Sequence, residues 1–539
     1  MQFNIADLFE SVADAVPGRT ALVCGDRRLT FSELDLRSTK MANVLRARGV
    51  GPGDHVGLYL YNGAEFIEAM LAAFKLRAVP ININYRYVEA ELTYLFDNAR
   101  LVALVHQREL SAHAARAARA VPSLRTFISV ADGEEAERAP VDIDSIDYES
   151  ALASASPERS FGDRSGDDLY IIYTGGTTGM PRGVMWRHAD VFYAGLQGGR
   201  PGGEPLERPE ELASVAREAE EPLTFLPAAP LIHGAAQWAT LIGLFGGGKV
   251  VLQAGRSFNA RAVCQLIERE RVNTLTFVGD AMARPLVDEL SAPGASYDTS
   301  SLFVIASAGA ILSDAVKDAL ASLLPNTMVL NNFGASETGH QGTTGVFQSD
   351  QARGRPSFYM DDSNTVLGDD MRPLQPGSSS IGKLARRGRL PIGYFNDPEK
   401  TAKTFVTIDG ERWVIPGDLA TLEEDGRITV LGRGAVCINS GGEKIFPEEV
   451  ESALKAHPSV QDAVVVGVPD ERWGQRVAAI VEPREGAGVT LEELETFCRT
   501  LVAGYKVPRQ LHVVSRIVRH PSGKPDYRWA AATARGEAT

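Results

Sequence analysis

Apolar segments of strand length alternate with helical patterns along the first part of the chain. The segments at 56–61, 101–106 and 272–278 are mostly apolar, and each is followed by a stretch with helical spacing. The same alternation continues to about residue 333. Nearly continuous apolar runs are typical of strands buried on both faces. The pattern therefore predicts parallel sheets covered by helices, which is an α/β fold.

The pattern changes in the remaining part of the chain. Residues 340–430 are rich in Gly, Pro and Asp, which predicts short antiparallel strands joined by turns. We place a domain boundary near Leu431. After it, about a hundred residues show the order helix, strand, strand, helix, strand. This order predicts a small α+β domain at the carboxy terminus.

The composition is that of a globular protein with an acidic surface. The chain has 539 residues, enough for about three or four domains or subdomains. Hydrophobic residues make up 44% of it, which excludes a disordered chain. The formal net charge of −14 argues against nucleic acid as a partner, because an acidic surface repels phosphate backbones.

The cysteines and the amino terminus predict a cytoplasmic protein. The 4 cysteines lie far apart and form no C-x-x-C pair, so neither a disulfide framework nor a zinc site is indicated. The first residues include Asp7, Glu10 and Asp14, where a signal peptide would carry basic residues and then an apolar stretch. The long uncharged stretch 222–248 is interrupted by Pro and Gly, so we expect no transmembrane segment.

A glycine- and threonine-rich segment gives the first chemical signal. Residues 173–184 read YTGGTTGMPRGV and follow a strand pattern. Backbone N–H groups and hydroxyls on such a loop can surround phosphate oxygens. The segment does not match the G-x-x-x-x-G-K-[ST] loop of P-loop proteins, and a surface loop is the alternative for this segment taken alone. The candidate phosphate-binding residues are Thr174, Gly175, Gly176, Thr177, Thr178 and Gly179.

Six further motifs follow in order along the chain. They are PAAPLIHG (227–234), NNFGASETG (331–339), IPGDLA (415–420), GRGAVCINSGGEKIFPEEVE (432–451), YKVPR (505–509) and PSGKPDYR (521–528). With the glycine-rich segment, they resemble the adenylate-forming (ANL) superfamily, specifically the AMP-forming acyl-CoA synthetases. A finer resemblance is to actinobacterial synthetases of sterol side-chain acids and long-chain fatty acids. It is carried by GVMWRH (183–188), GDAMARP (279–285), INSGGEK (438–444) and KPDYRW (524–529).

The resemblance implies a domain plan and a reaction. The plan is a large domain over residues 1–431, a hinge at 432–436 and a small mobile α+β domain over 437–539. The large domain is expected to contain stacked α/β subdomains and a β-barrel-like part. The implied reaction joins a carboxylic acid to ATP, with Mg²⁺, to form an acyl-adenylate, and then transfers the acyl group to CoA.

The resemblance also assigns roles to individual charged residues. Lys524 is expected to bridge the substrate carboxylate and the α-phosphate of ATP. Glu337 and Thr177 are expected to bind Mg²⁺, a cation that prefers oxygen ligands. Asp418 is expected to accept hydrogen bonds from the ribose hydroxyls, with Arg433 beside it.

Further site residues come from the same motifs. Phe333 is expected to lie against adenine, although a phenylalanine that ends a buried strand is the alternative. Gly334 and Ser336 adjoin it in the nucleotide site. His233 is expected to act where the acid meets the phosphate, and the alternative is a histidine of the core. The candidate CoA-binding residues are Gly441, Gly442 and Lys444.

Two positions depart from the family pattern. Arg182 stands where relatives usually have Lys in the phosphate loop, which keeps the charge but changes the donor geometry. The hinge reads Arg433, Gly434, Ala435, Val436 and lacks the usual Asp or Lys, although Gly434 keeps it flexible.

Two alternative functions stay open from the sequence. One is an acyl-AMP ligase that loads a carrier protein, and the other is a catalytically silent nucleotide-binding protein. The presence of Lys524, Glu337 and Asp418 together argues against the silent protein. Residues 229–232 offer no carboxylate to hold an ammonium group, which indicates an acid without an α-amine. A homodimer is left open.

Overall fold

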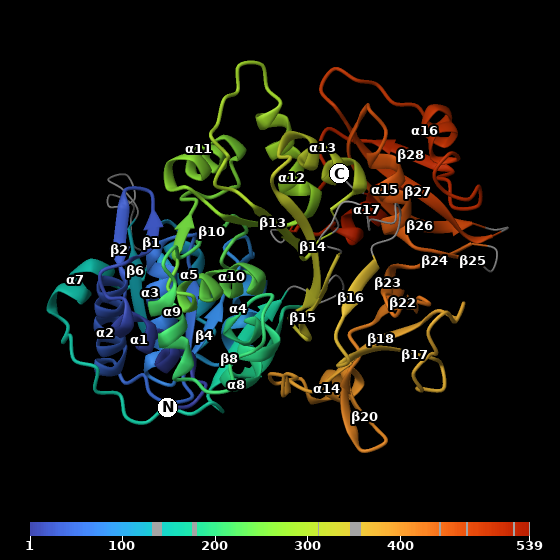
Figure 1. Ribbon diagram of the computed structural model, residues 1–539. Helices are drawn as coiled ribbons and strands as arrows, with labels where there is room; N and C mark the ends of the chain where they lie inside the picture. The colour runs from blue at the N-terminus through green and yellow to red at the C-terminus, as the bar shows by residue number, and fades with distance from the viewer. Residues whose placement is uncertain are drawn as a thin grey trace.

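The described part of the chain folds around three β-sheets, two in a large amino-terminal domain and one in a small carboxy-terminal domain (Figure 1). The fold class predicted from the sequence is confirmed. The structure is a computed structural model, and it describes residues 1–131, 143–174, 180–310, 312–344, 357–440, 443–470, 473–520 and 523–537.

One sheet of the large domain is mostly parallel. Its strand order is β19-β9-β8-β4-β3-β5-β6-β7, and the pairs from β8 to β7 are parallel, whereas β9 and β19 pair antiparallel at one edge. The segments at 56–61 and 101–106 contribute strands β3 and β5, as predicted. The strands are β3 (His55–Tyr59), β4 (Val79–Asn82), β5 (Leu101–Gln107), β6 (Thr126–Val130), β7 (Ile146–Asp147), β8 (Leu169–Thr174), β9 (Arg182–Arg187) and β19 (Gly393–Tyr394).

The other sheet of the large domain changes from parallel to antiparallel pairing. Strands β1, β11, β10, β12, β13 and β14 are parallel neighbours in that order, and β2 is antiparallel to β1. From β14 onward the pairing is antiparallel, as the composition of 340–430 predicts. The parallel strands and β2 are β1 (Thr20–Cys24), β2 (Arg27–Thr30), β10 (Thr224–Pro227), β11 (Lys249–Leu252), β12 (Thr274–Phe277), β13 (Val304–Ala308) and β14 (Met328–Ala335).

The antiparallel strands occupy the region expected to be barrel-like. Strand β18 pairs with β17, β22 and β21, and β20 follows β21. The strands are β15 (Gly339–Thr343), β16 (Ser357–Met360), β17 (Asn364–Leu367), β18 (Gly382–Arg387), β20 (Phe405–Ile408), β21 (Glu411–Val414), β22 (Asp418–Leu422) and β23 (Ile428–Arg433).

A short helix, α14 (Pro398–Thr404), interrupts this region, where the sequence predicts only strands and turns. Asp397 caps it by accepting a hydrogen bond from the backbone N–H of Lys400 at 3.0 Å. Proline at the first helical position needs no hydrogen-bond partner for its nitrogen, which also favours a helix start here.

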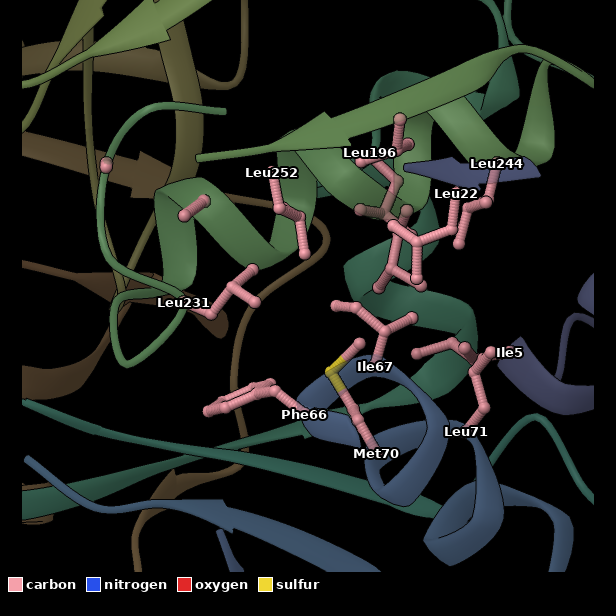
Figure 2. Close-up of a cluster of buried hydrophobic side chains, with 14 of the residues drawn as sticks. Ile5, Leu22, Phe66, Ile67, Met70, Leu71, Leu196, Leu231, Leu244 and Leu252 are labelled. Atoms are coloured by element: carbon pink, nitrogen blue, oxygen red, sulfur yellow. The ribbon is translucent and has the colours of Figure 1, made fainter. Parts of the chain in front are cut away.

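Helix α3 (Ala64–Lys75) lies between the two sheets of the large domain and contacts strands of both. It is apolar on most of its circumference, as a helix packed on all sides must be. Figure 2 shows Ile67 and Met70 among apolar side chains that include Leu22 of β1, Leu244 of α10 and Leu252 of β11. The other helices of the large domain are α1 (Ile5–Ala15), α2 (Phe31–Ala47), α4 (Glu89–Asn98), α5 (Ser111–Ala118), α7 (Tyr148–Ser154), α8 (His188–Ala194), α9 (Glu211–Glu218), α10 (Gly234–Phe245), α11 (Ala260–Glu270), α12 (Gly279–Leu290) and α13 (Asp314–Leu323).

The small domain is a sheet with helices on both faces. Alternate residues of β26 and β27 face two separate apolar clusters, since successive side chains of a strand point to opposite faces. Helices α15 and α16 contribute to one cluster and α17 to the other. Its elements are β24 (Ile438–Ser440), β25 (Glu443–Ile445), α15 (Pro447–Lys455), β26 (Val460–Asp470), β27 (Gly474–Pro483), α16 (Leu491–Cys498), β28 (Gln510–Val513) and α17 (Tyr527–Ala534).

The chain passes from the large sheet to the small sheet within a few residues. Strand β23 ends at Arg433, a 3₁₀ turn occupies Gly434–Val436, and β24 begins the small sheet. Of the predicted hinge residues 432–436, the first two end strand β23 and the last three form this turn, which connects two sheets that share no strand.

A buried ion pair joins the two domains. The Lys455 ammonium on α15 lies 2.9 Å from Oδ2 of Asp280 on α12, and the two side chains are only 5% and 6% exposed. Asp280 Oδ1 also accepts a hydrogen bond from the Ser313 N–H at 2.8 Å. Burial alone would raise the pKa of Asp280, but the nearby ammonium outweighs burial and holds that pKa below its usual range. Asp280 belongs to the GDAMARP segment, so this segment anchors the small domain.

Replacing Asp280 with asparagine tests this anchor. Asp280→Asn keeps the acceptor for Ser313 but removes the carboxylate that the buried Lys455 ammonium contacts, and breaking a buried ion pair typically costs about 3 to 5 kcal/mol. We expect faster amide hydrogen exchange at Gly434–Val436 and in α15, because the docked arrangement opens more often.

The chain offers a matched control in a second ion pair between the domains. Asp288 lies 3.5 Å from Arg484, and both side chains are well exposed, at 44% and 38%. Asp288→Asn should change exchange little, because exposed pairs contribute about 0 to 1 kcal/mol. Equal exchange in the two variants would contradict an anchoring role for Asp280.

Candidate active site

Two carboxylates and two cations meet where the small domain contacts the antiparallel part of the large domain. Asp418 begins β22 and Arg433 ends β23, and these two residues are register partners whose charged groups lie 3.7 Å apart. Lys524 of the small domain and Glu337 of the β14–β15 turn complete the cluster. The structure therefore brings together four residues that the sequence analysis selected from four separate motifs.

The charges in this cluster influence one another strongly. Burial raises the pKa of Asp418, and the Arg433 guanidinium and the Lys524 ammonium oppose that effect. Burial lowers the pKa of Lys524 and Arg433 adds to the effect, whereas Glu337 and Asp418 oppose it. Shifts of this kind, produced by burial and by specific charged neighbours, are typical of functional sites.

A short hairpin of the small domain presents Lys524. Arg519 donates two hydrogen bonds to Asp462, both at 2.7 Å, and a third to the Gly523 carbonyl at 2.8 Å. The His520 N–H donates to the Lys524 carbonyl at 2.9 Å. Gly523 has φ +75°, and a Cβ there would lie 3.0 Å from a methyl group of Val278 in the large domain. Glycine therefore permits both the turn and its close contact with the large domain.

Glu337 lies on a turn that is held from two sides. Tyr394 donates its hydroxyl to Glu337 Oε1 at 2.9 Å, and the Trp186 indole N–H donates to the Ser336 carbonyl at 2.8 Å. Burial and the neighbouring Glu337 raise the pKa of Tyr394, so this phenol stays a hydrogen-bond donor. A Cβ at Gly334 would lie 2.2 Å from the Gly339 carbonyl oxygen, so only glycine fits where the two strands meet.

The aromatic candidate Phe333 lies near the end of β14. Its ring centroid is 5.2 Å from that of Phe358, and it packs at the border of the apolar cluster of the antiparallel strands. The ring is half-buried. This position fits the strand-end alternative and leaves part of the ring accessible to an adenine.

His233 is half-buried at the start of α10, where it is the residue before the first helical turn. The next residue, Gly234, approaches the Glu337 turn, since a Cβ at Gly234 would lie 3.9 Å from Ser336 Oγ. The structure thus places His233 on a segment that borders the turn carrying Glu337.

Several candidates are not brought into the cluster. Residues 175–179, which include Thr177, and the pair Gly441 and Gly442 lie outside the described residues. Thr174 ends β8 and is the register partner of Arg182, the first residue of β9. The Arg182 Nε donates to Asp397 at 3.1 Å, so the unusual arginine is held by the residue that caps α14. Lys444 is exposed on β25, the edge strand of the small sheet.

Sequence reasoning missed the two residues that hold the Glu337 turn. Trp186 falls in the GVMWRH segment, which the sequence analysis used only as a sign of the subgroup. Tyr394 stands 57 positions from Glu337 in the chain, and no local pattern marks it. Each position offers one signal: it is an aromatic residue with a polar atom, and such a residue usually forms a hydrogen bond when it is buried.

Known proteins match the whole chain. Residues 9–393 match the AMP-binding enzyme family, and residues 449–524 match the AMP-binding enzyme C-terminal domain. The 3-oxocholest-4-en-26-oate–CoA ligase of Rhodococcus rhodochrous is 49% identical over 537 residues, which cover 98% of this chain and 96% of the relative. A medium/long-chain-fatty-acid–CoA/3-oxocholest-4-en-26-oate–CoA ligase of Mycolicibacterium smegmatis is 50% identical, with the same shares covered.

A solved structure agrees with the fold. The anthranilate CoA ligase AuaEII, in complex with anthranoyl-AMP, superposes with a TM-score of 0.84 at 23% identity, and the match covers 99% of this chain and 98% of that one. At this identity the likeness shows the fold alone.

The chain belongs to the AMP-binding enzyme family, whose members form adenylates. Within that family it is an AMP-forming acyl-CoA ligase, and its small-molecule substrates include ATP and CoA. No helix in the described ranges has both the length and the apolar character that a membrane crossing requires.

A further carboxylate, Glu448, is confined at the junction of the two domains. A Cβ at Gly432 (φ +121°) would lie 2.6 Å from Glu448 Oε2, and this oxygen is inaccessible and accepts no hydrogen bond from the described residues. Burial, with the nearby Glu451 carboxylate, raises the pKa of Glu448 to about 8, from an ordinary value of 4.5. The structure therefore favours the protonated acid.

The raised pKa predicts a pH dependence of stability. Below pH 4.5 Glu448 is protonated whether folded or unfolded, and its full contribution to stability is present. As the pH rises toward about 8, the unfolded chain ionises first, and stability is lost. The amide of Glu448→Gln does not ionise in this range. We therefore expect the Tm of this variant to fall less between pH 5.5 and pH 8.5 than the Tm of the wild type. The exposed control Glu443→Gln should follow the wild type, and parallel curves for all three proteins would contradict the prediction.

Proposed function

We propose that this protein activates a hydrophobic carboxylic acid and that the cluster of Lys524, Arg433, Asp418 and Glu337 is the centre of the first step. In that step a carboxylate oxygen of the acid bonds to the α-phosphorus of ATP, and the bond from that phosphorus to pyrophosphate breaks. In the second step the CoA sulfur bonds to the acyl carbon, its proton is released, and AMP leaves. The observation that carries the proposal is the convergence of these four charged groups at the domain contact.

Lys524 supplies positive charge where two anions must meet. The acid and the ATP phosphates repel each other, so a preorganised cation at the reacting oxygen lowers the barrier. Burial lowers the pKa of the Lys524 ammonium, and the carboxylates of Glu337 and Asp418 act against this, which favours the charged form. The hairpin bonds of Arg519 fix the backbone beside Lys524, so this charge is held in place before the substrates bind.

Asp418 and Arg433 are suited to the ribose. The raised pKa of Asp418 indicates that this carboxylate has too few hydrogen-bond donors around it in the free protein. The two ribose hydroxyls could supply donors in place of the water that burial removes. Phe333 is proposed to lie against the adenine ring, with Gly334 and Ser336 beside it.

Glu337 is proposed to hold Mg²⁺ together with Thr177. The described residues contain no group of three or more His, Cys, Asp or Glu that could bind a metal ion by themselves. Mg²⁺ commonly binds through one or two protein oxygens and the phosphates of a nucleotide, and a single carboxylate on a held turn fits this mode. The ion, when bound, neutralises phosphate charge.

The small domain is proposed to present two faces in turn. Lys524 faces the large domain in this structure, whereas Lys444 is exposed on the edge strand β25, near Gly441 and Gly442 in the sequence. A rotation about residues 432–436 would withdraw the first face and bring the second to the site for the CoA step. Gly434 adjoins the large sheet with space around it, because a Cβ there would make only ordinary contacts, 3.4 Å or longer.

Two further assignments stay predictions. The cytoplasmic location rests on the wide spacing of the four cysteines along the chain. The homodimer is to be decided by sedimentation of the purified chain.

The proposed acid is a sterol side-chain acid or a long- or medium-chain fatty acid. Relatives about half identical to this chain are ligases of 3-oxocholest-4-en-26-oate and of medium- and long-chain fatty acids. The segment before His233 supports an acid without an amine, since Ala229, Leu231 and Ile232 are buried and apolar.

Separating the two half-reactions tests the roles of the two lysines. Lys524→Ala should lower acyl-adenylate formation by about 10² to 10³ or more, because it removes a transition-state charge. The same variant should make thioester from supplied acyl-adenylate and CoA at nearly the wild-type rate.

Lys444→Ala serves as the matched variant in this experiment. It should form adenylate normally and lose rate in the thioester step, measured by AMP and acyl-CoA release. If Lys524→Ala is folded and equally slow in both half-reactions, the two-face arrangement is wrong. Wild-type adenylate formation without transfer to CoA would favour an acyl-AMP ligase instead.

A panel of acids tests the substrate proposal. We expect a higher kcat/KM for 3-oxocholest-4-en-26-oate than for octanoate, with pyrophosphate release as the measurement. A much higher kcat/KM for octanoate would overturn the preference for bulky acids and leave the reaction class unchanged.

A further inference from the structure

A buried asparagine joins two segments of the large domain, each of which leads into residues that the sequence predicts for the site. Asn82 is the last residue of β4 and is 5% exposed. Its Nδ2 donates to the Tyr173 carbonyl at 2.8 Å and to the Ile232 carbonyl at 2.6 Å. Its Oδ1 accepts from the Tyr173 N–H at 2.8 Å. Both amide hydrogens are used, and the N–H of Tyr173 fixes which end of the amide carries the oxygen.

The two segments are neighbours of site residues. Tyr173 comes directly before Thr174 and the glycine-rich residues 175–179. Ile232 comes directly before His233, which occupies the N-cap position of α10. These segments belong to different sheets of the large domain, since β8 carries Tyr173 and the segment after β10 carries Ile232. Asn82 therefore sets the distance between the end of β8 and the segment before His233, which no shared strand connects.

Two other amide side chains hold the same histidine segment at different points. Asn62 accepts from the Leu231 N–H at 2.8 Å, and Gln237 donates to the Leu231 carbonyl at 2.7 Å. These bonds order the segment around Leu231. Asn82 differs from both because it also binds the strand that leads into the glycine-rich loop.

Neither a carboxylate nor an apolar side chain can replace this amide. A carboxylate has no hydrogen to donate to the two carbonyls, and an apolar residue would leave all three backbone groups without this partner. The carboxyl ends of β4 and β8, neighbouring parallel strands, are also the place where ligands bind in open α/β sheets. The amide thus lies at the edge of the sheet where a ligand is expected.

We propose that Asn82 is a positioning residue for adenylate formation: it fixes the spacing between the end of β8, directly before the glycine-rich sequence, and the His233 segment, so that the ATP phosphates and the acid meet in reacting geometry. The proposal rests on the proposed function. A displacement of about 1 Å in such a site can lower the rate about 100-fold. The CoA step starts from a preformed adenylate and depends less on this spacing.

The experiment compares Asn82→Ala with a control asparagine that has the same kind of contacts. Asn43 is 7% exposed and its Nδ2 donates to two backbone carbonyls, those of Ser156 and Glu158, on a different segment. Both half-reactions are measured with 3-oxocholest-4-en-26-oate or dodecanoate, whichever the wild type turns over faster, and with the matching synthetic acyl-adenylate. Tm is measured for every variant.

We expect Asn82→Ala to lower the kcat of adenylate formation about 10- to 100-fold and to keep thioester formation from supplied adenylate within about threefold of wild type. Asn43→Ala should lose a similar amount of Tm and keep both rates. Asn82→Ser keeps one hydroxyl donor in less volume, so we expect an intermediate adenylation rate, and it provides the readout if the alanine variant does not fold.

Four outcomes would overturn the proposal. Equal losses in both half-reactions, or equal losses in the Asn82 and Asn43 variants, would make Asn82 a purely structural residue. Unchanged adenylation in folded Asn82→Ala and Asn82→Ser would remove it from the site. A wild-type protein that forms no adenylate would refute the proposed function itself, and with it this role.

Discussion

Buried charge in the seam between the two domains is the constraint on which the rest of the site depends. Lys455 and Asp280 are both almost inaccessible, and neither charge is tolerable there without the other. Their contact fixes how the small domain docks on α12. In that docked position Gly523 packs against Val278, and the next residue, Lys524, joins the carboxylates of the large domain. The position of the Lys524 charge thus depends on a different pair of charges, Lys455 and Asp280, which joins the two domains.

The large domain holds its own half of the site mainly by side chains that bind backbone carbonyls. Trp186 binds the Ser336 carbonyl, Arg386 binds the Thr338 carbonyl at 2.6 Å, and Asn82 binds the segments beside Thr174 and His233. Loops that carry function need such support, because their own hydrogen bonds do not fix them against the rest of the fold. The donors lie on strands, which are rigid, and the acceptors lie on or beside the functional turns.

The departure at Arg182 also has a structural consequence. A guanidinium can donate from several nitrogens, and here Nε is engaged with Asp397, the cap of α14. The arginine therefore links the strand after the glycine-rich loop to the segment that carries Tyr394, which in turn holds Glu337. A lysine at position 182 would have a single nitrogen for both this contact and a phosphate.

The sequence by itself determined the α/β class and the small carboxy-terminal domain, because apolar runs mark strands. It also selected Glu337, Asp418, Arg433 and Lys524, because the short motifs around them resemble those of the AMP-forming acyl-CoA synthetases. Only the tertiary structure decided which residues meet. Asn82 binds partners 91 and 150 positions away, and nothing within its own strand distinguishes it from an ordinary polar residue. These hydrogen bonds form only where the two sheets of the large domain pack together. No local sequence pattern contains that long-range arrangement.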